Sequence, residues 1–416
     1  MSGVAIGLDL GTSGVRAALV DAARAPLAIA AAAIAPERRR DPEAWWQAAA
    51  QALDALRDRA DLGTVRALAV DGTSGTVLAV NAAGTPLGPA SLYNDRADPA
   101  LVARIAAAAP SGSAAHGATS PAAKLLGLQD VPGIAWLLHE ADWLAGRLCG
   151  RFGMSDANNA LKTGYDPVAQ GWPDWLAAAG AKPALLPAVQ PPGTAVAPVL
   201  LAVATRFGLA ADAMVAAGTT DGCAAFLATG ATRAGDGVTS LGTTLTLKLL
   251  SDAPVFAPTF GIYSHRLGAR WLPGGASNSG GAALARHFDA ATLARLSARI
   301  DPARDSGLDY YPLPGPGERF PIADPALPPR EAPRPADEAA FLHGLLEGIA
   351  RIEALGYQRL ADLGAPPLRS VRTVGGGAAN VVWTALRARI LGVPMLPARS
   401  QEAAVGTAGL ALQALA

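Results

Sequence analysis

The first stretch of the chain whose residue types suit chemistry lies close to its start. Two apolar runs flank Gly11-Thr12-Ser13-Gly14, the pattern of a β-hairpin with a glycine-rich turn. The turn offers two hydroxyls and several backbone N–H groups, and its glycines carry no side chain to obstruct a ligand, so it suits a phosphate. Asp9, just before the turn, could reach a divalent cation that accompanies that phosphate. The alternative is an ordinary hairpin built from turn-forming residues.

A second copy of this pattern changes the balance between these two interpretations. Residues 238–250 again place a short polar tip, Gly242-Thr243-Thr244, between two β-prone runs. Two such hairpins in separate halves of the chain predict a duplicated architecture whose tips face one another across a cleft. A polyphosphate in that cleft would be held from both sides.

Asp221 is the candidate for proton transfer. It follows a turn of glycine and threonine at residues 218–220 and precedes a helix of small residues. A carboxylate presented there is suited to accept a proton from an attacking hydroxyl. It could equally be the N-cap of the helix, which is the commoner role of Asp in that position.

Three further polar stretches are candidates for substrate contact. Residues 71–76, with Asp71 and Ser74, follow a predicted buried strand, where ligand contacts collect in α/β sheets; a tight loop is the alternative. Asp95 and Arg96 could hydrogen-bond a polyhydroxylated substrate, although spacing alone favours a helix N-cap followed by a salt bridge. The stretch 155–161 either lines the cleft or knits a loop together.

Glycine-rich segments in the second half are the candidates for nucleotide binding. Gly275 lies in a run, 274–281, that we interpret as a turn leading into a helix over 282–288. Residues 375–380 follow a predicted strand and open a helix, and their three glycines allow close approach of a flat ring or a phosphate. This spacing is not a P-loop, because no Gly-Lys-Ser/Thr follows.

The elements that must position these residues alternate between strands and helices. Asp41 and Pro42 are predicted to open a helix that runs to about Ala60. The remaining predictions are strands over 21–34 after a turn, 65–70, 77–80, 215–217 and 371–374, helical structure over 100–150 and 336–363, and a small-residue helix at the end. Residues 312–335 contain nine prolines, which predicts an ordered surface excursion.

Length and composition limit the classes of function. At 416 residues, two domains are expected, and we place them at 1–230 and 231–416. Lys+Arg and Asp+Glu both number 34, so charge gives no case for a nucleic acid or an anionic membrane as partner. Two cysteines are too few for a disulfide framework. The first residues lack the pattern of a signal peptide, which favours a cytoplasmic protein.

With these segments in place, the chain resembles the FGGY family of carbohydrate kinases, within the actin/hexokinase/Hsp70-like superfamily. The resemblance rests on four segments in the family's order: 7–13, 218–222, 240–244 and 375–380. It implies an α/β fold of two ribonuclease-H-like domains with a nucleotide cleft between them, the first binding sugar and phosphate and the second the nucleotide.

The resemblance also implies roles for single residues, with ATP and Mg²⁺ as cofactors. Asp221 is implied to be the base and Asp9 to lie beside the metal and the transferred phosphate. The phosphate contacts implied are Gly11, Thr12, Ser13, Gly242, Thr243 and Thr244. Gly376, Gly377 and Asn380 are implied to line the adenosine pocket. Dimers are common among similar kinases, so a homodimer is the one protein partner that the resemblance suggests.

The turn 72–75 and the stretch 155–167 are most similar to compact D-ribulose kinases that are often labelled xylulose kinase. In that comparison Asp71, Ser74 and Asp95 contact the sugar, and the Met-His-Gly associated with xylulokinases is absent from the turn. The expected activity is therefore ATP-dependent phosphorylation of a ketopentose, D-ribulose before D-xylulose. The alternatives are a kinase for another sugar or polyol, an inactive nucleotide- or sugar-binding regulator on the same fold, and an ATP hydrolase with a protein client.

Overall fold

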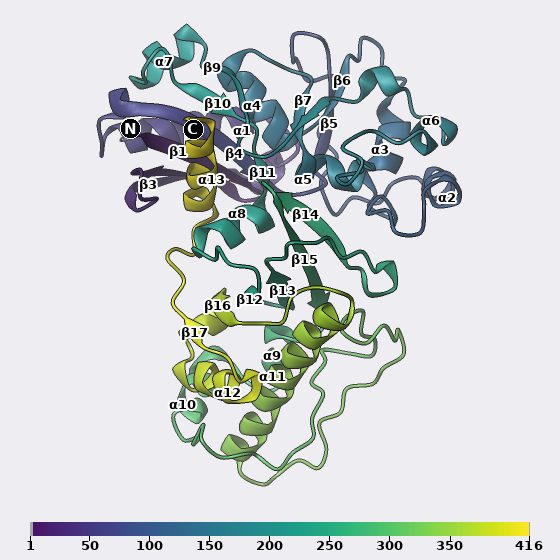
Figure 1. The fold of residues 1–416 in the computed structure, drawn as a ribbon, viewed down its shortest axis with the longest axis vertical. Helices are drawn as coiled ribbons and strands as arrows, with labels where there is room; N and C mark the ends of the chain where they lie inside the picture. The colour runs from purple at the N-terminus through teal and green to yellow at the C-terminus, as the bar shows by residue number, and fades with distance from the viewer. Residues whose placement is uncertain (1–2, 416) are drawn as a thin grey trace. The chain divides into compact units, whose positions relative to one another are not determined.

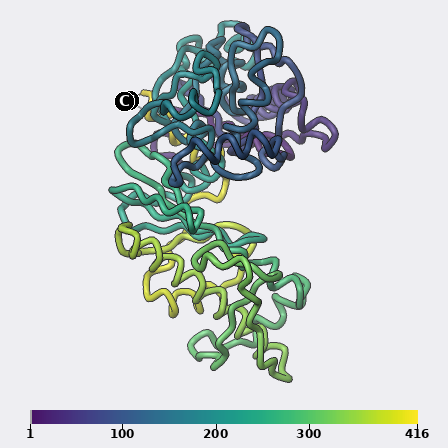
Figure 2. Tube along the Cα trace, turned by 90° about the vertical axis from the view of Figure 1, so that its right-hand side faces the viewer, coloured from purple at the N-terminus to yellow at the C-terminus, as the bar shows by residue number. Residues whose placement is uncertain are grey.

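The computed structural model describes residues 3–415, which form two compact units (Figures 1 and 2). Unit 1 comprises the chain up to Ala228 together with His265–Gly268 and the C-terminal segment from Glu402, and unit 2 comprises Thr229–Ser264 and Ala269–Gln401. The predicted boundary after residue 230 lies close to the first crossing. The C-terminal helix, which we had placed in the second domain, belongs to unit 1.

The sheet of unit 1 carries the first hairpin. Its strands are β1 (Val4–Gly11), β2 (Gly14–Val20), β3 (Pro26–Ala33), β4 (Val65–Gly72), β9 (Ala195–Pro198), β10 (Met214–Ala216) and β11 (Thr219–Thr220). They run in the order β3-β2-β1-β4-β10-β9, and β11 pairs with the end of β4. β1 is antiparallel to β2 and parallel to β4, so the carboxyl ends of β1 and β4 meet at one edge.

The sheet of unit 2 repeats this design. Its strands are β12 (Asp236–Leu241), β13 (Leu245–Leu249), β14 (Tyr263–Leu267), β15 (Arg270–Ser277), β16 (Ser370–Val374) and β17 (Met395–Leu396), in the order β14-β15-β13-β12-β16-β17. The last three residues of β14 fall in the segment assigned to unit 1. β12 is antiparallel to β13 and parallel to β16, as β1 is to β2 and β4. The predicted duplication of a hairpin-centred sheet is therefore confirmed.

Two small sheets and nine α-helices, together with short 3₁₀ turns, complete unit 1 in the described residues. The small sheets pair β5 (Val77–Val80) with β6 (Trp136–His139) and β7 (Met154–Asp156) with β8 (Ala188–Gln190). The helices are α1 (Pro42–Arg57), α2 (Pro99–Ala108), α3 (Pro121–Leu128), α4 (Glu140–Cys149), α5 (Ala157–Ala160), α6 (Trp175–Ala178), α7 (Leu201–Phe207), α8 (Asp221–Ala228) and α13 (Ala403–Ala411). None of the helices between residues 3 and 415 is long and apolar enough to cross a membrane.

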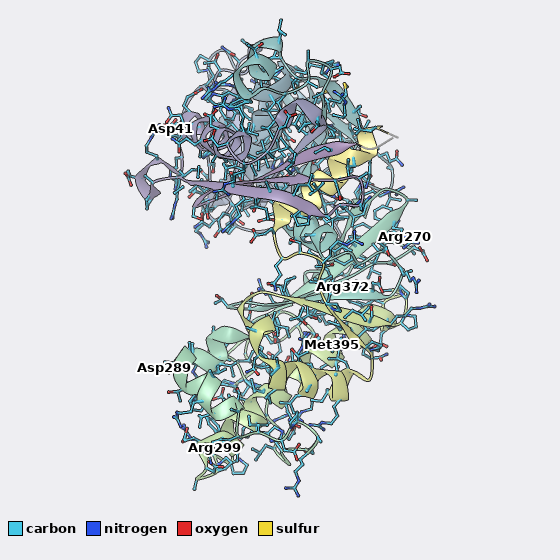
Figure 3. The ribbon with its side chains drawn as sticks, turned by 90° about the vertical axis from the view of Figure 1, so that its left-hand side faces the viewer. Asp41, Arg270, Asp289, Arg299, Arg372 and Met395 are labelled. Carbon is cyan, nitrogen blue, oxygen red and sulfur yellow. The ribbon has the colours of Figure 1, made fainter. Side chains whose placement is uncertain are left out.

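The α-helices of unit 2 differ in length, and one of them is far longer than the others. They are α9 (Gly281–Ala285), α10 (Ala290–Ser297), α11 (Glu338–Asp362) and α12 (Val381–Leu391), with a short 3₁₀ turn, η6 (Gly376–Ala379), before α12. α11 is buried along much of its length in the hydrophobic core of this unit. Figure 3 labels Asp289 and Arg299, the first of which caps α10 by accepting a hydrogen bond from Thr292 N.

Several helix ends lie where local sequence predicts them. Asp41, labelled in Figure 3, accepts a hydrogen bond from Glu43 N at 3.0 Å and caps α1, as expected. Asn380 caps α12 by accepting from Trp383 N at 3.0 Å. The predicted strands are observed with bounds shifted by a few residues. The terminal helix α13 packs against β1 so closely that a Cβ on Gly7 would lie 2.0 Å from Ala404 O.

Three predictions about secondary structure need correction. The region 100–150 is not all helical, because the apolar run Trp136–His139 pairs as β6 with β5. The run 274–281 is not one turn, because its first four residues belong to β15. The proline-rich segment lacks helices as predicted, but it is not only a surface excursion, since Leu313 and Phe320 are buried in the core of unit 2.

Candidate active site

Four carboxylates gather at the carboxyl ends of the central strands in unit 1. Asp9 on β1 and Asp71 on β4 are direct partners in the parallel register. β11 pairs in parallel with the end of β4 at the same place, and Asp221 follows β11 as the first residue of α8. The fourth carboxylate, Glu140, begins α4, and the charge of Asp221 acts on its pKa as it does on those of Asp9 and Asp71.

Asp71 is the most enclosed member of this cluster. Its side chain is fully buried and its Oδ2 accepts a hydrogen bond from the Thr407 hydroxyl on α13. Among the described residues, its Oδ1 has no hydrogen-bond partner. Burial, and next the charge of Asp9, raise the pKa of Asp71 well above its usual range. Because the whole side chain is buried and Thr407 holds one of its oxygens, the position of Asp71 favours a supporting role beside Asp9 over the predicted sugar contact.

Asp9 lies nearer to solvent. Its side chain is 13% exposed, and burial raises its pKa. The one cation beside it in the described chain is Arg16, whose Nη1 lies 3.9 Å from Asp9 Oδ2 and whose side chain is itself 54% exposed. Such an exposed pair stabilises little, so the cluster keeps an excess of negative charge. That excess favours a bound cation.

Asp221 is partly buried and is fixed by its own helix. Gly222 N–H donates to Asp221 Oδ1 at 2.6 Å, which holds the carboxylate at the amino end of α8. This contact is compatible with both interpretations left open by the sequence, a helix cap and a base. The neighbouring Asp9 and Glu140 distinguish the site from an ordinary helix start.

The polar stretch 155–161 serves to hold the strand that leads to Asp221. Asn158 Nδ2 donates to Thr219 Oγ1 at 2.9 Å, and Asn159 Nδ2 donates to Thr219 O at 3.1 Å. Asp156 caps α5 and accepts from the side chain of Asn159 at 2.6 Å. Of the two interpretations left open, the structure favours the one in which this stretch holds a loop together by hydrogen bonds.

Ser74 lies in a tight turn directly after β4. Thr76 N donates to Thr73 O at 3.2 Å across the turn, and Gly75 has φ of +98°, as position three of a type II turn requires. The Ser74 hydroxyl is buried and has no hydrogen-bond partner within the described part of the chain. A buried hydroxyl without a partner is costly, so this oxygen is a candidate for contact with a ligand.

Asp95 and Arg96 differ in how the structure uses them. Asp95 Oδ1 accepts from Arg40 Nη2 at 2.7 Å, its Oδ2 is also bonded to Arg40, and Oδ2 accepts from Leu92 N at 2.8 Å. The salt-bridge interpretation of Asp95 is thus observed, with Arg40 as the partner, while Asp98 is the residue that caps α2. Arg96 is exposed. The structure gives neither of them a place in the carboxylate cluster.

The two hairpin tips have the predicted glycine-rich form. In unit 1, Gly11 and Gly14 pair across a two-residue tip of Thr12 and Ser13. In unit 2, Leu241 pairs with Leu245 across Gly242-Thr243-Thr244. That second tip is fixed to the start of α9, because Gly242 O accepts from Gly281 N at 2.9 Å and Thr243 O accepts from Ala282 N at 3.0 Å.

A cavity of about 1080 Å³ lies within unit 2 beside the second tip. Its lining combines the tip with the glycines before α12 and with apolar side chains of α9, α10 and α12, including Gly242, Thr243, Gly376, Gly377, Asn380 and Phe288. Asn380 Nδ2 also donates to Ser297 Oγ at 2.9 Å, which ties the cap of α12 to α10. Backbone donors at one end and an apolar wall at the other suit a flat aromatic ring that carries phosphates.

Gly275 is not part of this cavity. It lies inside β15, paired with Leu247 of β13, and a Cβ there would lie 2.6 Å from the Phe320 ring. Its missing side chain is explained by packing against Phe320, so the prediction of Gly275 as a nucleotide contact in a turn is not supported by its position.

Sequence reasoning missed two members of the site in unit 1. Glu140 lay in a region predicted as continuous helix, and only the pairing of β6 with β5 brings it behind Gly72, where a Cβ would meet its side chain at 2.9 Å. Thr407 lies 336 positions after Asp71 in the chain. No local signal marks either residue, because both reach the site through tertiary packing.

Among residues 3–415, no group of three or more His, Cys, Asp or Glu side chains has the arrangement of a metal cage. Both cysteines, Cys149 and Cys223, are buried, and neither forms a disulfide bond.

Comparison with known proteins identifies the architecture. The N-terminal domain model of the FGGY family of carbohydrate kinases matches residues 4–228, and the C-terminal domain model matches residues 237–415. The chain is 29% identical to a xylulose kinase of Escherichia coli over 93% of its own length and 84% of that protein, and 29% identical to a xylulose kinase of Streptomyces coelicolor over 98% and 87%.

Solved structures agree with this match. A xylulose kinase from Rhodospirillum rubrum superposes with a TM-score of 0.84 at 25% identity, over 98% of this chain and 89% of that one. A glycerol kinase from Plasmodium falciparum, at 16% identity and a TM-score of 0.82 over 99% and 90%, shows the same fold. The two-domain α/β fold predicted from the sequence is confirmed. Since the two family models together cover most of its length, the chain belongs to the FGGY family of carbohydrate kinases and is an ATP-dependent phosphotransferase.

Proposed function

We propose that this kinase transfers the γ-phosphoryl group of ATP to a hydroxyl of a ketopentose, with D-ribulose preferred to D-xylulose. The observation that carries the proposal is the meeting of Asp9, Asp71, Glu140 and Asp221 at the ends of the central strands, next to a turn with a buried, unpartnered Ser74 hydroxyl. Carboxylates beside hydroxyl and backbone donors are what phosphoryl transfer to an alcohol requires.

Two observations bear on the choice of sugar, and they favour different ketopentoses. The relatives in the comparison are named xylulose kinases, which supports a ketopentose and makes D-xylulose the second candidate. The turn after β4 reads Gly72-Thr73-Ser74-Gly75, however, and lacks the Met-His-Gly that we associate with xylulokinases. A serine hydroxyl in place of larger side chains changes which sugar hydroxyls can be bonded.

Asp221 is the proposed base. Its carboxylate is oriented by Gly222 N–H and by the amino end of α8, so it can accept the proton of the attacking hydroxyl without rearranging. Asp9 lies on the neighbouring strand, and we assign to it the position beside the transferred phosphate. The N–H groups and hydroxyls of Thr12 and Ser13 are the proposed phosphate donors in unit 1.

Asp9 is also the residue that would hold Mg²⁺. The fit is supported by the excess negative charge of the cluster and by Asp71 Oδ1, which has no partner in the described chain. Mg²⁺ is commonly bound by one or two carboxylates together with substrate phosphates, so Asp9 would hold it together with the phosphates of ATP. When bound, Mg²⁺ neutralises charge that develops on the phosphate oxygens.

We assign the nucleotide to the cavity of unit 2. Gly376, Gly377 and Asn380, which line the cavity, are the proposed adenosine contacts. Gly242 and Thr243, which also line it, and Thr244, which follows them in the tip, are the proposed phosphate contacts of this unit. The apolar side chains of α9 and α10 would exclude water from the adenine ring.

The test is ADP release, measured with a coupled assay, from ATP and Mg²⁺ with D-ribulose, D-xylulose, aldopentoses, polyols and glycerol. D-ribulose should give the highest kcat/KM. Asp221→Asn keeps the acceptor for Gly222 N–H but removes the base, so kcat should fall by about 10²–10⁴ while the Kd for ATP stays within twofold. Full activity of this variant would exclude Asp221 as the base. Binding of sugar without turnover of any substrate would favour the inactive regulator instead.

A further inference from the structure

The turn that carries Ser74 is held by buried charged side chains from two different helices. On one side, Glu140 Oε1 of α4 accepts from Thr73 N at 2.6 Å, and Glu140 N donates to Thr76 O at 3.2 Å. On the other side, Lys124 Nζ of α3 donates to Gly75 O at 3.1 Å. The backbone on both sides of Ser74 is therefore fixed.

Lys124 joins this turn to a second loop. Its Nζ also donates to Leu92 O at 2.5 Å, and Tyr93 N donates to Thr76 Oγ1 at 3.2 Å. Lys124 is only 4% exposed, which is unusual for a lysine and has a desolvation cost. Two carbonyls and the nearby Asp95 carboxylate offset that cost. These contacts indicate that Lys124 has a structural role in holding the two loops together.

We propose that Lys124 and Glu140 are positioning residues for the sugar, because they clamp the turn 73–76 so that the unpartnered Ser74 hydroxyl points at one fixed place. This inference rests on the proposed function of Ser74 as a sugar contact. A hydroxyl held in advance loses little conformational entropy when it bonds a ligand, so the clamp raises affinity for a sugar whose hydroxyl fits and leaves nucleotide binding unaffected.

The direct test is Lys124→Met, which keeps the aliphatic stem and removes the charge and donors. We expect the KM for the preferred pentulose to rise at least tenfold, with the KM for ATP within twofold of wild type. Lys182→Met is the matched control, because Lys182 lies on the same unit but its side chain is 55% exposed, and its Nζ bonds Asp130 Oδ1 and Gln129 O away from the turn. Equal changes in both KM values would overturn the inference, since they would indicate general damage.

A double-mutant cycle separates this inference from the proposed function itself. If Lys124 acts through Ser74, Lys124→Met should have little further effect on the sugar KM in a Ser74→Ala background. Additive effects would refute the clamp while leaving Ser74 as a sugar contact. No effect of Ser74→Ala alone on the sugar KM would instead refute the proposed contact.

A pH profile keeps the inference testable if Lys124→Met does not fold. Burial lowers the pKa of Lys124 to about 8; among the charged groups that face it, Asp95 opposes this shift while Arg40 and Lys162 add to it. Above this pH the loss of charge weakens both carbonyl contacts, so the sugar KM of the wild-type enzyme should rise from pH 7.5 to 9. The ratio of sugar KM between Ser74→Ala and wild type should fall over the same range. A pH-independent ratio would count against the clamp.

Discussion

The ion pair between Arg387 of α12 and Glu353 of α11 offers the sharpest test of how the nucleotide cavity is built. Both side chains are completely buried. Arg387 Nε donates to Glu353 Oε2 at 2.5 Å, Nη2 donates to Oε1 at 2.7 Å, and Nη1 donates to Thr373 Oγ1 at 2.7 Å. α12 supplies residues 381–383 to the cavity wall, so this pair holds the wall on the core of unit 2.

Removing one partner should be costly because it leaves the other charge buried. In Arg387→Met, Glu353 keeps the hydroxyl of Thr239 as a donor at 2.5 Å but loses its only bidentate cation. We expect the free energy that holds α12 in place to fall by about 3–5 kcal/mol. In the double variant Arg387→Met/Glu353→Leu no charge is left buried, so about half or more of that loss should be recovered.

Hydrogen exchange of the α12 amides is the suitable assay, because a chain with two units need not unfold in one step and a global Tm would mix both. The KM for ATP should rise in Arg387→Met and return toward wild type in the double variant. The reasoning is refuted if Arg387→Met changes α12 protection by less than about 1 kcal/mol, or if the double variant is less stable than either single variant.

Two further predictions concern packing and pH. In Gly406→Ala the new Cβ would lie 2.0 Å from Ala224 O, so α13 must move away from α8. We expect the free energy of unfolding, measured by thermal unfolding, to fall by about 1–3 kcal/mol. We also expect kcat to fall, because the neighbouring Thr407 bonds Asp71. The control is Gly112→Ala, because no atom lies within 4 Å of a Cβ added at that position. Equal melting temperatures for the two variants would contradict the argument. Burial, followed by the charges of Lys162 and Lys124, lowers the pKa of His139 to about 3. The unfolded chain therefore binds this proton more tightly, and stability is lost as pH falls below about 6.5. Buried carboxyl groups with a raised pKa change the stability in the opposite direction, so the test compares two proteins. Between pH 7 and 5, the free energy of unfolding in urea should fall by about 2 kcal/mol less in His139→Asn than in wild type. If the free energy of unfolding changed equally with pH in both proteins, protonation of His139 would not be linked to unfolding.

Local sequence was sufficient to predict the elements that carry the site. Glycines flanking Thr12-Ser13 and the tip Gly242–Thr244 predicted both hairpins, because a tight turn between β-prone runs has few alternatives. Asp41 followed by Pro42 predicted the start of α1 for a similarly local reason. Four segments in order were enough to predict the fold class, which the family models confirm.

The tertiary structure decided which polar residues share an environment. The sequence placed Asp71 in a polar turn after a buried strand, but β4 continues through it and the Thr407 hydroxyl, from the far end of the chain, bonds its carboxyl group. Gly275 looked like part of a ligand-binding turn, but strand pairing and the Phe320 ring account for it. Lys124 gave no signal at all. Burial and hydrogen-bond partners depend on residues distant in sequence, so spacing alone determines where a side chain lies on its own element and not what it meets there.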